Sequence, residues 1–253
     1  MLAKEWLTNV RSVMDKIENT QEDTIKKAAE IMADSIEAGR WVHTFGCGHA
    51  TIPIEEMYPR IGGFVGFHPI IELPLSFFTH IYGEMGIHQF LFLERMEGYG
   101  QQIMKSYTFD TRDTMWLFSH SGINNANIDV AMDAKKRGMK VVVTGSADEF
   151  KDKPTRHSSG KKIFDIADIV IDSCVPIQDA SVDLKNHRDK IGPLSTMGFV
   201  TCVWMVITTV AEILADRGVN LHIHPSHNVP GDTTARERLD DALAEYKRRI
   251  AGV

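Results

Sequence analysis

Apolar residues near the start of the chain recur every three to four positions, which is the spacing of a helix. The first such pattern spans residues 2–17. A second spans 20–38 and starts with Thr20, followed three residues later by Asp23, a variant of the helix capping box. The pattern therefore predicts a pair of helices within residues 1–39.

Short apolar runs alternate with helical stretches over the middle of the chain. The predicted strands are 41–45, 64–71, 113–118, 139–144 and 168–171, and the predicted helices between them are 52–58, 96–107 and 125–137. Residues 75–95 fit neither period. Strands that alternate with helices form parallel sheets with helices on both faces. We predict an α/β fold, a doubly wound parallel sheet over residues 40–215, followed by a C-terminal loop and helix over 216–253.

The most apolar segment covers residues 197–210 and contains three threonines. It is short for a membrane span. We expect a helix that is buried in the core or at a subunit interface, because so much apolar surface needs a cover. A monomer is therefore not expected.

Composition excludes several classes of protein. The 253 residues are 43% hydrophobic and 25% charged, with a net charge of −6 and no basic block, so no nucleic-acid partner is expected. Cys47, Cys174 and Cys202 are too few for a disulfide framework and favour a reducing compartment. The N-terminal stretch lacks the apolar core of a signal peptide. We expect a cytoplasmic protein without a membrane partner.

The stretch LFSHSGINN, residues 117–125, places two serines, a histidine and a glycine between a predicted strand and a helix. The N-terminus of a helix offers unpaired N–H groups and a partial positive charge, and glycine lets a ligand approach the backbone. Helix capping alone needs only one of these residues. We therefore predict an anion site with neutral donors. Its candidate residues are Ser119, His120, Ser121, Gly122, Asn124 and Asn125.

A second glycine-containing loop, Gly46-Cys47-Gly48, follows the first predicted strand. Gly-x-Gly is a weak signal, and the third glycine of a dinucleotide fingerprint is missing, so we predict no cofactor. No base is evident beside Cys47, which is interpreted as a small residue filling the loop.

These motifs resemble the SIS (sugar isomerase) family of phosphosugar isomerases and binders, which includes phosphoheptose isomerases. The resemblance rests on the Ser-x-Ser-Gly loop and on the segments KKRGMKVVVTGS, IKKAAEIMADSIEAGRWVHTFGCGH, RHSSGKK and FDIADIVIDS. It implies a flavodoxin-like five-stranded parallel sheet and a homodimer or homotetramer. It also implies a phosphate held by Ser119, Ser121 and Asn124, with the 46–49 loop lining the sugar.

Moving a carbonyl along a sugar requires a base, and a carboxylate in a dry pocket is suited to this because burial raises its pKa. By the resemblance, two glutamates occupy matching positions: Glu56, on the helix after the first strand, and Glu72, after the second. Glu72 is slightly favoured, because it lies at a strand end beside a proline. Glu94 and Glu97 are interpreted as helix-surface charges.

Histidines could open the sugar ring or protonate an oxygen. His49 and His120 lie in the two predicted ligand loops, and His157 lies in RHSSGKK, which has the composition of a substrate lid. No histidine occurs over 193–217, where phosphoheptose isomerases carry a second catalytic group. Ser195 or Thr196 occupies that neighbourhood, and Ser195 is included as a candidate for substrate binding.

The segment HIHPSH, residues 222–227, leaves two interpretations open. Alternate histidines could bind a metal ion. A loop at a subunit interface is favoured, because no cysteine or clear carboxylate completes a ligand set, and we predict no metal.

Together these features favour a cytoplasmic aldose–ketose isomerase of a phosphorylated sugar, with a glutamate general base. Three alternatives remain: a non-catalytic phosphosugar sensor, a lyase, deglycase or etherase of an amino-sugar phosphate, and an isomerase of a sulfonated sugar.

Overall fold

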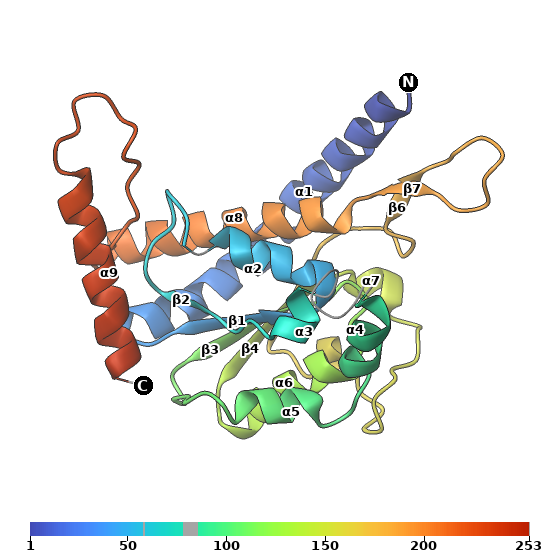
Figure 1. The fold of residues 1–253 in the computed structure, drawn as a ribbon, viewed down its shortest axis with the longest axis horizontal. Coiled ribbons are helices and arrows are strands. Elements are labelled where there is room, and N and C mark those ends of the chain that lie inside the picture. Colours follow the sequence, from blue (N-terminus) through green and yellow to red (C-terminus); the bar gives the residue numbers. More distant parts are fainter. Residues whose placement is uncertain (58, 78–85, 253) are drawn as a thin grey trace.

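The computed structural model describes residues 1–57, 59–77 and 86–252, and its centre is a five-stranded parallel sheet (Figure 1). The strands stand in the order β2-β1-β3-β4-β5, and every neighbouring pair is parallel. Their bounds are β1 Val42–Gly46, β2 Phe67–Pro69, β3 Thr114–Phe118, β4 Lys140–Gly145 and β5 Ile169–Asp172. The predicted flavodoxin-like α/β fold is confirmed.

Alternate residues of the central strands enter two separate cores. Trp116 and Phe118 face the side covered by α1 (Leu2–Glu37) and α8 (Ser195–Asp216). Met115 and Leu117 face the side covered by α5 (Tyr99–Met104) and α6 (Asn125–Lys136). Both faces of β3 are thus buried, which explains why its sequence is a continuous apolar run.

The remaining short elements connect this sheet to its helical layers. They are η1 Gly48–Thr51, α2 Ile52–Met57, α3 Leu73–Ser76, α4 Ile87–Glu94, α5 Tyr99–Met104, α6 Asn125–Lys136, α7 Ala147–Phe150 and η2 Ile163–Asp165. Tyr58, the predicted end of the helix after the first strand, and residues 78–85 lie outside the described residues.

The N-terminal region differs from the prediction, because α1 is one helix of 36 residues rather than a pair. Thr20 does not cap a second helix. It lies inside α1, and its hydroxyl donates to the backbone carbonyl of Lys16 at 2.7 Å, as helix-internal threonines do. The predicted break is therefore wrong, and both halves of α1 carry buried residues, from Val10 to Ile36.

The strand predicted over 64–71 is also shorter than expected. β2 covers only Phe67–Pro69 and lies at the edge of the sheet, the position where a proline is tolerated because its missing N–H can face outward. Phe64 instead forms an isolated antiparallel bridge with Ile223 of the C-terminal region.

The predicted apolar helix is α8, which is longer than the sequence pattern indicated. Within residues 1–57, 59–77 and 86–252 it is the one helix whose length and composition alone would allow it to cross a membrane. One face of it packs in the core with α1 through Phe199, Val203 and Val210, as expected for a buried helix.

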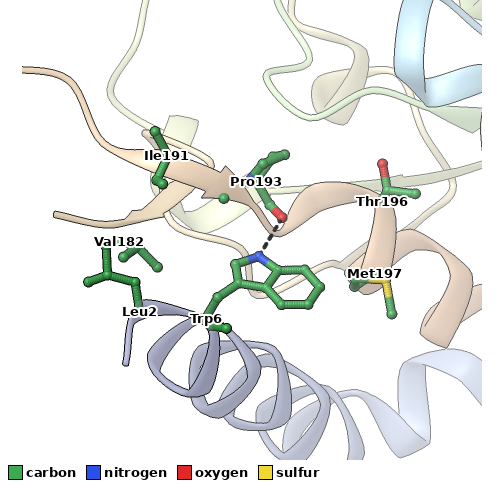
Figure 2. Close-up of a pocket in the computed structure, with 9 residues that line it drawn as sticks. Leu2, Trp6, Val182, Ile191, Pro193, Thr196 and Met197 are labelled. Atoms are coloured by element: carbon green, nitrogen blue, oxygen red, sulfur yellow. Dashed lines mark hydrogen bonds between the residues drawn. The ribbon is translucent and has the colours of Figure 1, made fainter. Parts of the chain in front are cut away.

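A hairpin that the sequence pattern did not predict precedes α8. Its strands are β6 Ala180–Val182 and β7 Ile191–Pro193. Trp6 of α1 donates its indole N–H to the Pro193 carbonyl at 3.2 Å, so the hairpin is attached to the first turns of α1, and a largely apolar pocket lies around this contact (Figure 2).

The predicted C-terminal helix is α9 (Ala235–Ala251), which packs near the start of β1. Arg249 donates to the backbone carbonyls of Ile36 and Arg40, and the Trp41 ring packs against Tyr246.

Candidate functional site

The topological switch point of the sheet lies between β1 and β3. From β1 the chain continues to β2 on one side, and from β3 it continues to β4 on the other. Ligands of open parallel sheets bind beyond the carboxyl ends of the strands at such a point. The loops after β1 and β3, which carry the two predicted ligand motifs, both start at this edge.

Backbone hydrogen bonds hold the Ser119–Asn124 loop against the end of β4. The N–H of Ser119 donates to the Thr144 carbonyl at 3.1 Å, and the N–H of Ser146 donates to the His120 carbonyl at 3.0 Å. The buried Ser119 hydroxyl accepts the N–H of Gly122 at 3.1 Å. The loop is therefore preorganised without a ligand.

Two features of this loop meet the needs of an anion site. Gly122 has φ +68°, and an added Cβ would overlap the ring of Phe164, so the turn requires glycine. Ser121 is half-buried, and among the described residues its hydroxyl makes no hydrogen bond, which leaves it available to a ligand.

The start of α6 is not capped in the usual way. Asn124 occupies the N-cap position but makes no side-chain capping bond. Its amide nitrogen instead donates to Glu94 Oε2 at 2.9 Å, and its amide oxygen accepts from the Arg156 guanidinium. The first-turn N–H groups of this 12-residue helix are thus left without the Asn124 side chain as their acceptor.

Glu94 is the buried carboxyl of this region. It is 7% exposed, and burial raises its pKa, while the nearby charges of Arg95 and Arg156 and the Asn124 hydrogen bond oppose that rise. The interpretation of Glu94 as a helix-surface charge is therefore wrong. Glu97 is exposed, as interpreted, but it lies in the turn between α4 and α5 rather than on a helix, and it accepts the backbone N–H of Ser158.

The loop after β1 packs against α4 and α6. Gly48 has φ +62°, and a Cβ there would lie 2.8 Å from the Phe90 ring. Cys47 is buried and accepts the Asn127 amide at 3.5 Å. Burial, helped by the charge of Glu94, raises the Cys47 pKa well above its ordinary value, which fits the loop-filling interpretation and disfavours a thiolate. Gly46 ends β1, and His49 is exposed at the loop surface.

The two glutamates favoured from the sequence lie in different surroundings. Glu56, on α2, accepts the Trp204 indole N–H at 3.2 Å and pairs with Arg60 at 3.0 Å, so it faces α8. Glu72 precedes α3 and accepts the Tyr99 hydroxyl at 2.6 Å. No hydrogen bond among the described residues joins either one to the Ser119–Asn124 loop.

His157 lies within the loop that was predicted as a lid, with its side chain buried. Its Nδ1 accepts the N–H of Ser159 at 3.1 Å, and its Nε2 lies 3.2 Å from Asp129. Asp129 also accepts the N–H of Gly98 at 2.7 Å. These contacts fix the loop to α6 and to the start of α5.

His120 and Ser195 differ in the hydrogen bonds that their side chains make. His120 Nε2 lies 3.4 Å from the Ile177 carbonyl, while its buried Nδ1 has no partner within the described parts of the chain. Ser195 begins α8, and its hydroxyl donates to Asp179 at 2.9 Å. Asn125, on α6, donates to the Arg95 carbonyl at 2.8 Å.

The histidines at 222–227 do not form a recognisable metal centre. Across residues 1–57, 59–77 and 86–252 no group of three or more histidine, cysteine or acidic side chains could hold an ion. His222 instead lies 2.7 Å from Asp241 of α9, and His224 is buried in the loop.

The structure adds two residues that the sequence analysis did not place in the site, Glu94 and Arg156. The predicted cradle consisted of neutral donors, whereas Arg156 brings a guanidinium to Asn124. The only sequence signal for Arg156 was the basic character of RHSSGKK, which starts at this residue.

Comparison with known proteins agrees with the observed fold. Residues 5–146 match the SIS domain family. A UPF0309 protein of Thermoanaerobacter pseudethanolicus is 34% identical over 251 residues, covering 97% of this chain and 98% of the relative. A UPF0309 protein of Oceanobacillus iheyensis is 31% identical, covering 98% and 97%.

Among solved structures, a phosphoheptose isomerase from Neisseria gonorrhoeae is similar with a TM-score of 0.55 and 14% identity, covering 83% of this chain and 97% of that one. A phosphoheptose isomerase from Francisella tularensis has a TM-score of 0.53 and 13% identity, covering 83% and 96%. At these identities the likeness concerns the fold.

Proposed function

Because the chain belongs to the SIS domain family, we propose that it binds a phosphorylated sugar and interconverts its aldose and ketose forms through a carboxyl general base. The observation that carries this proposal is the contact between Asn124 and the buried Glu94 at the start of α6. It joins an anion-binding helix end to a carboxyl suited to proton transfer.

The phosphate group is assigned to the Ser119–Asn124 loop. The hydroxyl of Ser121 and the first-turn N–H groups of α6 are its donors, and the dipole of α6 favours the negative charge. Arg156 supplies a cation at the same end of the helix.

Glu94 is assigned the proton transfer between the two sugar carbons. Its carboxylate takes the proton from C2 of the open-chain aldose, which gives an enediolate, and the resulting carboxylic acid returns the proton to C1, so the reaction involves no net oxidation. Burial supports this role, since a raised pKa brings a carboxyl closer to the operating pH of a general base.

The other two glutamates are less buried than Glu94. Glu56 pairs with Arg60, and Glu72 accepts the Tyr99 hydroxyl. The oxygen atoms of the substrate also exchange a proton, for which His49 and His120 are the candidates, because they lie on the loops after β1 and β3.

Binding is tested first, by thermal unfolding in the presence of sugar phosphates and of the same sugars without phosphate. A ligand that binds only the folded state stabilises it by about 2.7 kcal/mol at a hundred times its dissociation constant. We expect a rise in midpoint with one or more sugar phosphates, none with the neutral sugars, and a smaller rise in Ser121→Ala. If no sugar phosphate raises the midpoint, the proposed substrate class is wrong.

Catalysis is tested by incorporation of solvent deuterium at C1 or C2 of the sugar phosphate that binds. Glu94→Gln should lower the exchange rate by about 100-fold or more while still binding the ligand, because general acid–base groups contribute roughly 10²–10⁴-fold. Glu97→Gln is the matched control and should exchange normally. Exchange that survives in Glu94→Gln but is lost in Glu56→Gln or Glu72→Gln would move the base to that residue, whereas binding without exchange in the wild type would make the protein a sensor.

A further inference from the structure

A polar hollow of about 510 Å³ lies between α1 and the segment that follows β5. Its volume is within the range of small-molecule sites in proteins. It shares no lining residue with the Ser119–Asn124 loop. The polar side chains at its walls are Asn9, Ser12, Lys16, Gln178, Ser181 and Lys190.

The charge of the hollow comes from two lysines that line it, Lys16 of α1 and Lys190 of the β6–β7 hairpin. Among residues 1–57, 59–77 and 86–252, no carboxylate lies within ion-pair distance of Lys16. Lys190 pairs with Asp183 at 3.1 Å, but the Asp183 side chain is 81% exposed, and such surface pairs contribute little. Both ammonium groups are therefore available to an anion.

Part of the lining of the hollow is apolar and forms its floor. It contains the buried side chains of Val13 and Leu194, together with the half-buried thiol of Cys174. A polar rim over an apolar floor is the usual composition of a ligand pocket.

The walls are held in place without a ligand. Asn9 donates its amide to the Ser181 carbonyl at 3.3 Å, which joins α1 directly to β6. The Ser181 hydroxyl donates to the Gly192 carbonyl at 3.1 Å, and the N–H of Ile177 donates to Glu149 at 3.2 Å. A preformed site avoids part of the entropy cost of binding.

We propose that this hollow is a second binding site, which takes a small molecule carrying a phosphate and hydroxyl groups. The two lysines match the double negative charge of a phosphate monoester, and the serine and amide side chains match hydroxyl groups. This site does not depend on the isomerase activity.

Cys174 provides a local readout. It is half-buried in the floor of the hollow, whereas Cys47 and Cys202 are buried, so N-ethylmaleimide should modify Cys174 first in the folded protein. The rate of modification at this residue is followed by mass spectrometry of its peptide. Inorganic phosphate and glucose 6-phosphate are the probes, with glucose as the neutral control and sodium chloride to keep the ionic strength constant.

We expect both phosphate probes to slow the modification by the factor 1 + [L]/Kd, about tenfold at ten times the dissociation constant, and glucose to leave it unchanged. Lys16→Gln with Lys190→Gln should remove the protection. Lys27→Gln, an exposed lysine elsewhere on α1, should keep it.

Ser121→Ala distinguishes this site from the proposed isomerase site. Protection that persists in Ser121→Ala and disappears in the lysine variant supports a second site. Protection that is absent with both phosphate probes, that survives in the lysine variant, or that is lost in Ser121→Ala overturns the proposal. None of these results bears on deuterium exchange by Glu94.

Discussion

Asn124 donates its side-chain amide to Glu94 across 2.9 Å, although the two residues are 30 positions apart in the sequence. The bond joins α4 to the first turn of α6 and turns an N-cap residue away from its own helix. It thus couples the charge of Glu94 to the loop assigned to the phosphate, and this coupling makes the pH dependence of activity informative.

The acid limb of the activity profile should follow the pKa of Glu94. Burial raises that pKa, and Arg95, Arg156 and Asn124 lower it, so removing a positive charge must raise it further. Arg156→Gln should therefore move the acid limb of kcat/KM to higher pH. A bound phosphate is a like charge and should also raise the pKa of Glu94. In the wild type the acid limb of kcat should therefore lie at higher pH than that of kcat/KM.

The measurement is isomerase rate against pH, judged by the position of the limb rather than its height. Arg112→Gln is the control, because Arg112 is exposed and pairs with Asp110 rather than with the site. A limb that stays in place or moves to lower pH in Arg156→Gln would show that Glu94 does not control it.

Replacing Gly122 with alanine should lower the free energy of unfolding. Alanine there would adopt φ +68° and would also overlap the Phe164 ring, whereas alanine at Gly160 would adopt φ +72° with open space around it. The backbone cost is about 1–2 kcal/mol at either position, and displacement of Phe164 adds about 1–3 kcal/mol at Gly122. Urea unfolding of the two variants should show the larger loss in Gly122→Ala, and equal losses would mean that Phe164 moves aside freely.

Much of the sheet could be predicted from the sequence, because buried parallel strands are continuous apolar runs that end at glycine or polar residues. The predicted bounds of β3 and β4 are within one residue of those observed. The break in α1 was a misleading local signal: Thr20 and Asp23 match a capping box, but the packing of both halves of the helix keeps it continuous.

The candidate site shows the same division between local and tertiary information. The Ser119–Asn124 loop was recognisable because a strand, a Gly-containing turn and a helix follow one another in sequence. Glu94 and Arg156 reach Asn124 from 30 and 32 positions away, so their place depends on how α4 and the 155–162 loop pack. No short pattern encodes that packing.

A cluster at the opposite end of the sheet should make the protein less stable in mild acid. His43 Nδ1 and His68 Nδ1 are 3.0 Å apart, and His43 Nε2 lies 3.3 Å from Asp113. Burial, followed by the charge of His43, lowers the pKa of His68 to about 4. Between that value and the ordinary pKa of about 6.5, the unfolded chain binds a proton that the folded chain does not.

Stability should therefore fall as the pH decreases from about 6.5 to 4, by roughly 1.4 kcal/mol per pH unit from this group. Urea midpoints across this range measure the slope. His68→Gln should make the slope shallower by about one proton, whereas His187→Gln, an exposed histidine, should not change it. An unchanged slope in His68→Gln would mean that His68 titrates normally in the folded protein.

Asp179 should be important for the start of α8. Its carboxylate accepts the N–H of Leu194 at 2.9 Å, the N–H of Ser195 at 2.7 Å and the Ser195 hydroxyl at 2.9 Å. It thus acts as a cap supplied from outside the helix, and loss of such a cap costs about 0.5–2 kcal/mol. Asp179→Ala should lower the free energy of unfolding by that amount, whereas Asp183→Ala, which removes only the exposed pair with Lys190, should cost less than about 1 kcal/mol. Urea unfolding compares the two.

Asp179→Asn separates the charge of this cap from its shape. Asp179 has φ +61°, a backbone conformation that asparagine tolerates, and asparagine keeps one acceptor oxygen. A loss of stability equal to that of Asp179→Ala would therefore assign the stabilisation to the charge at the helix N-terminus.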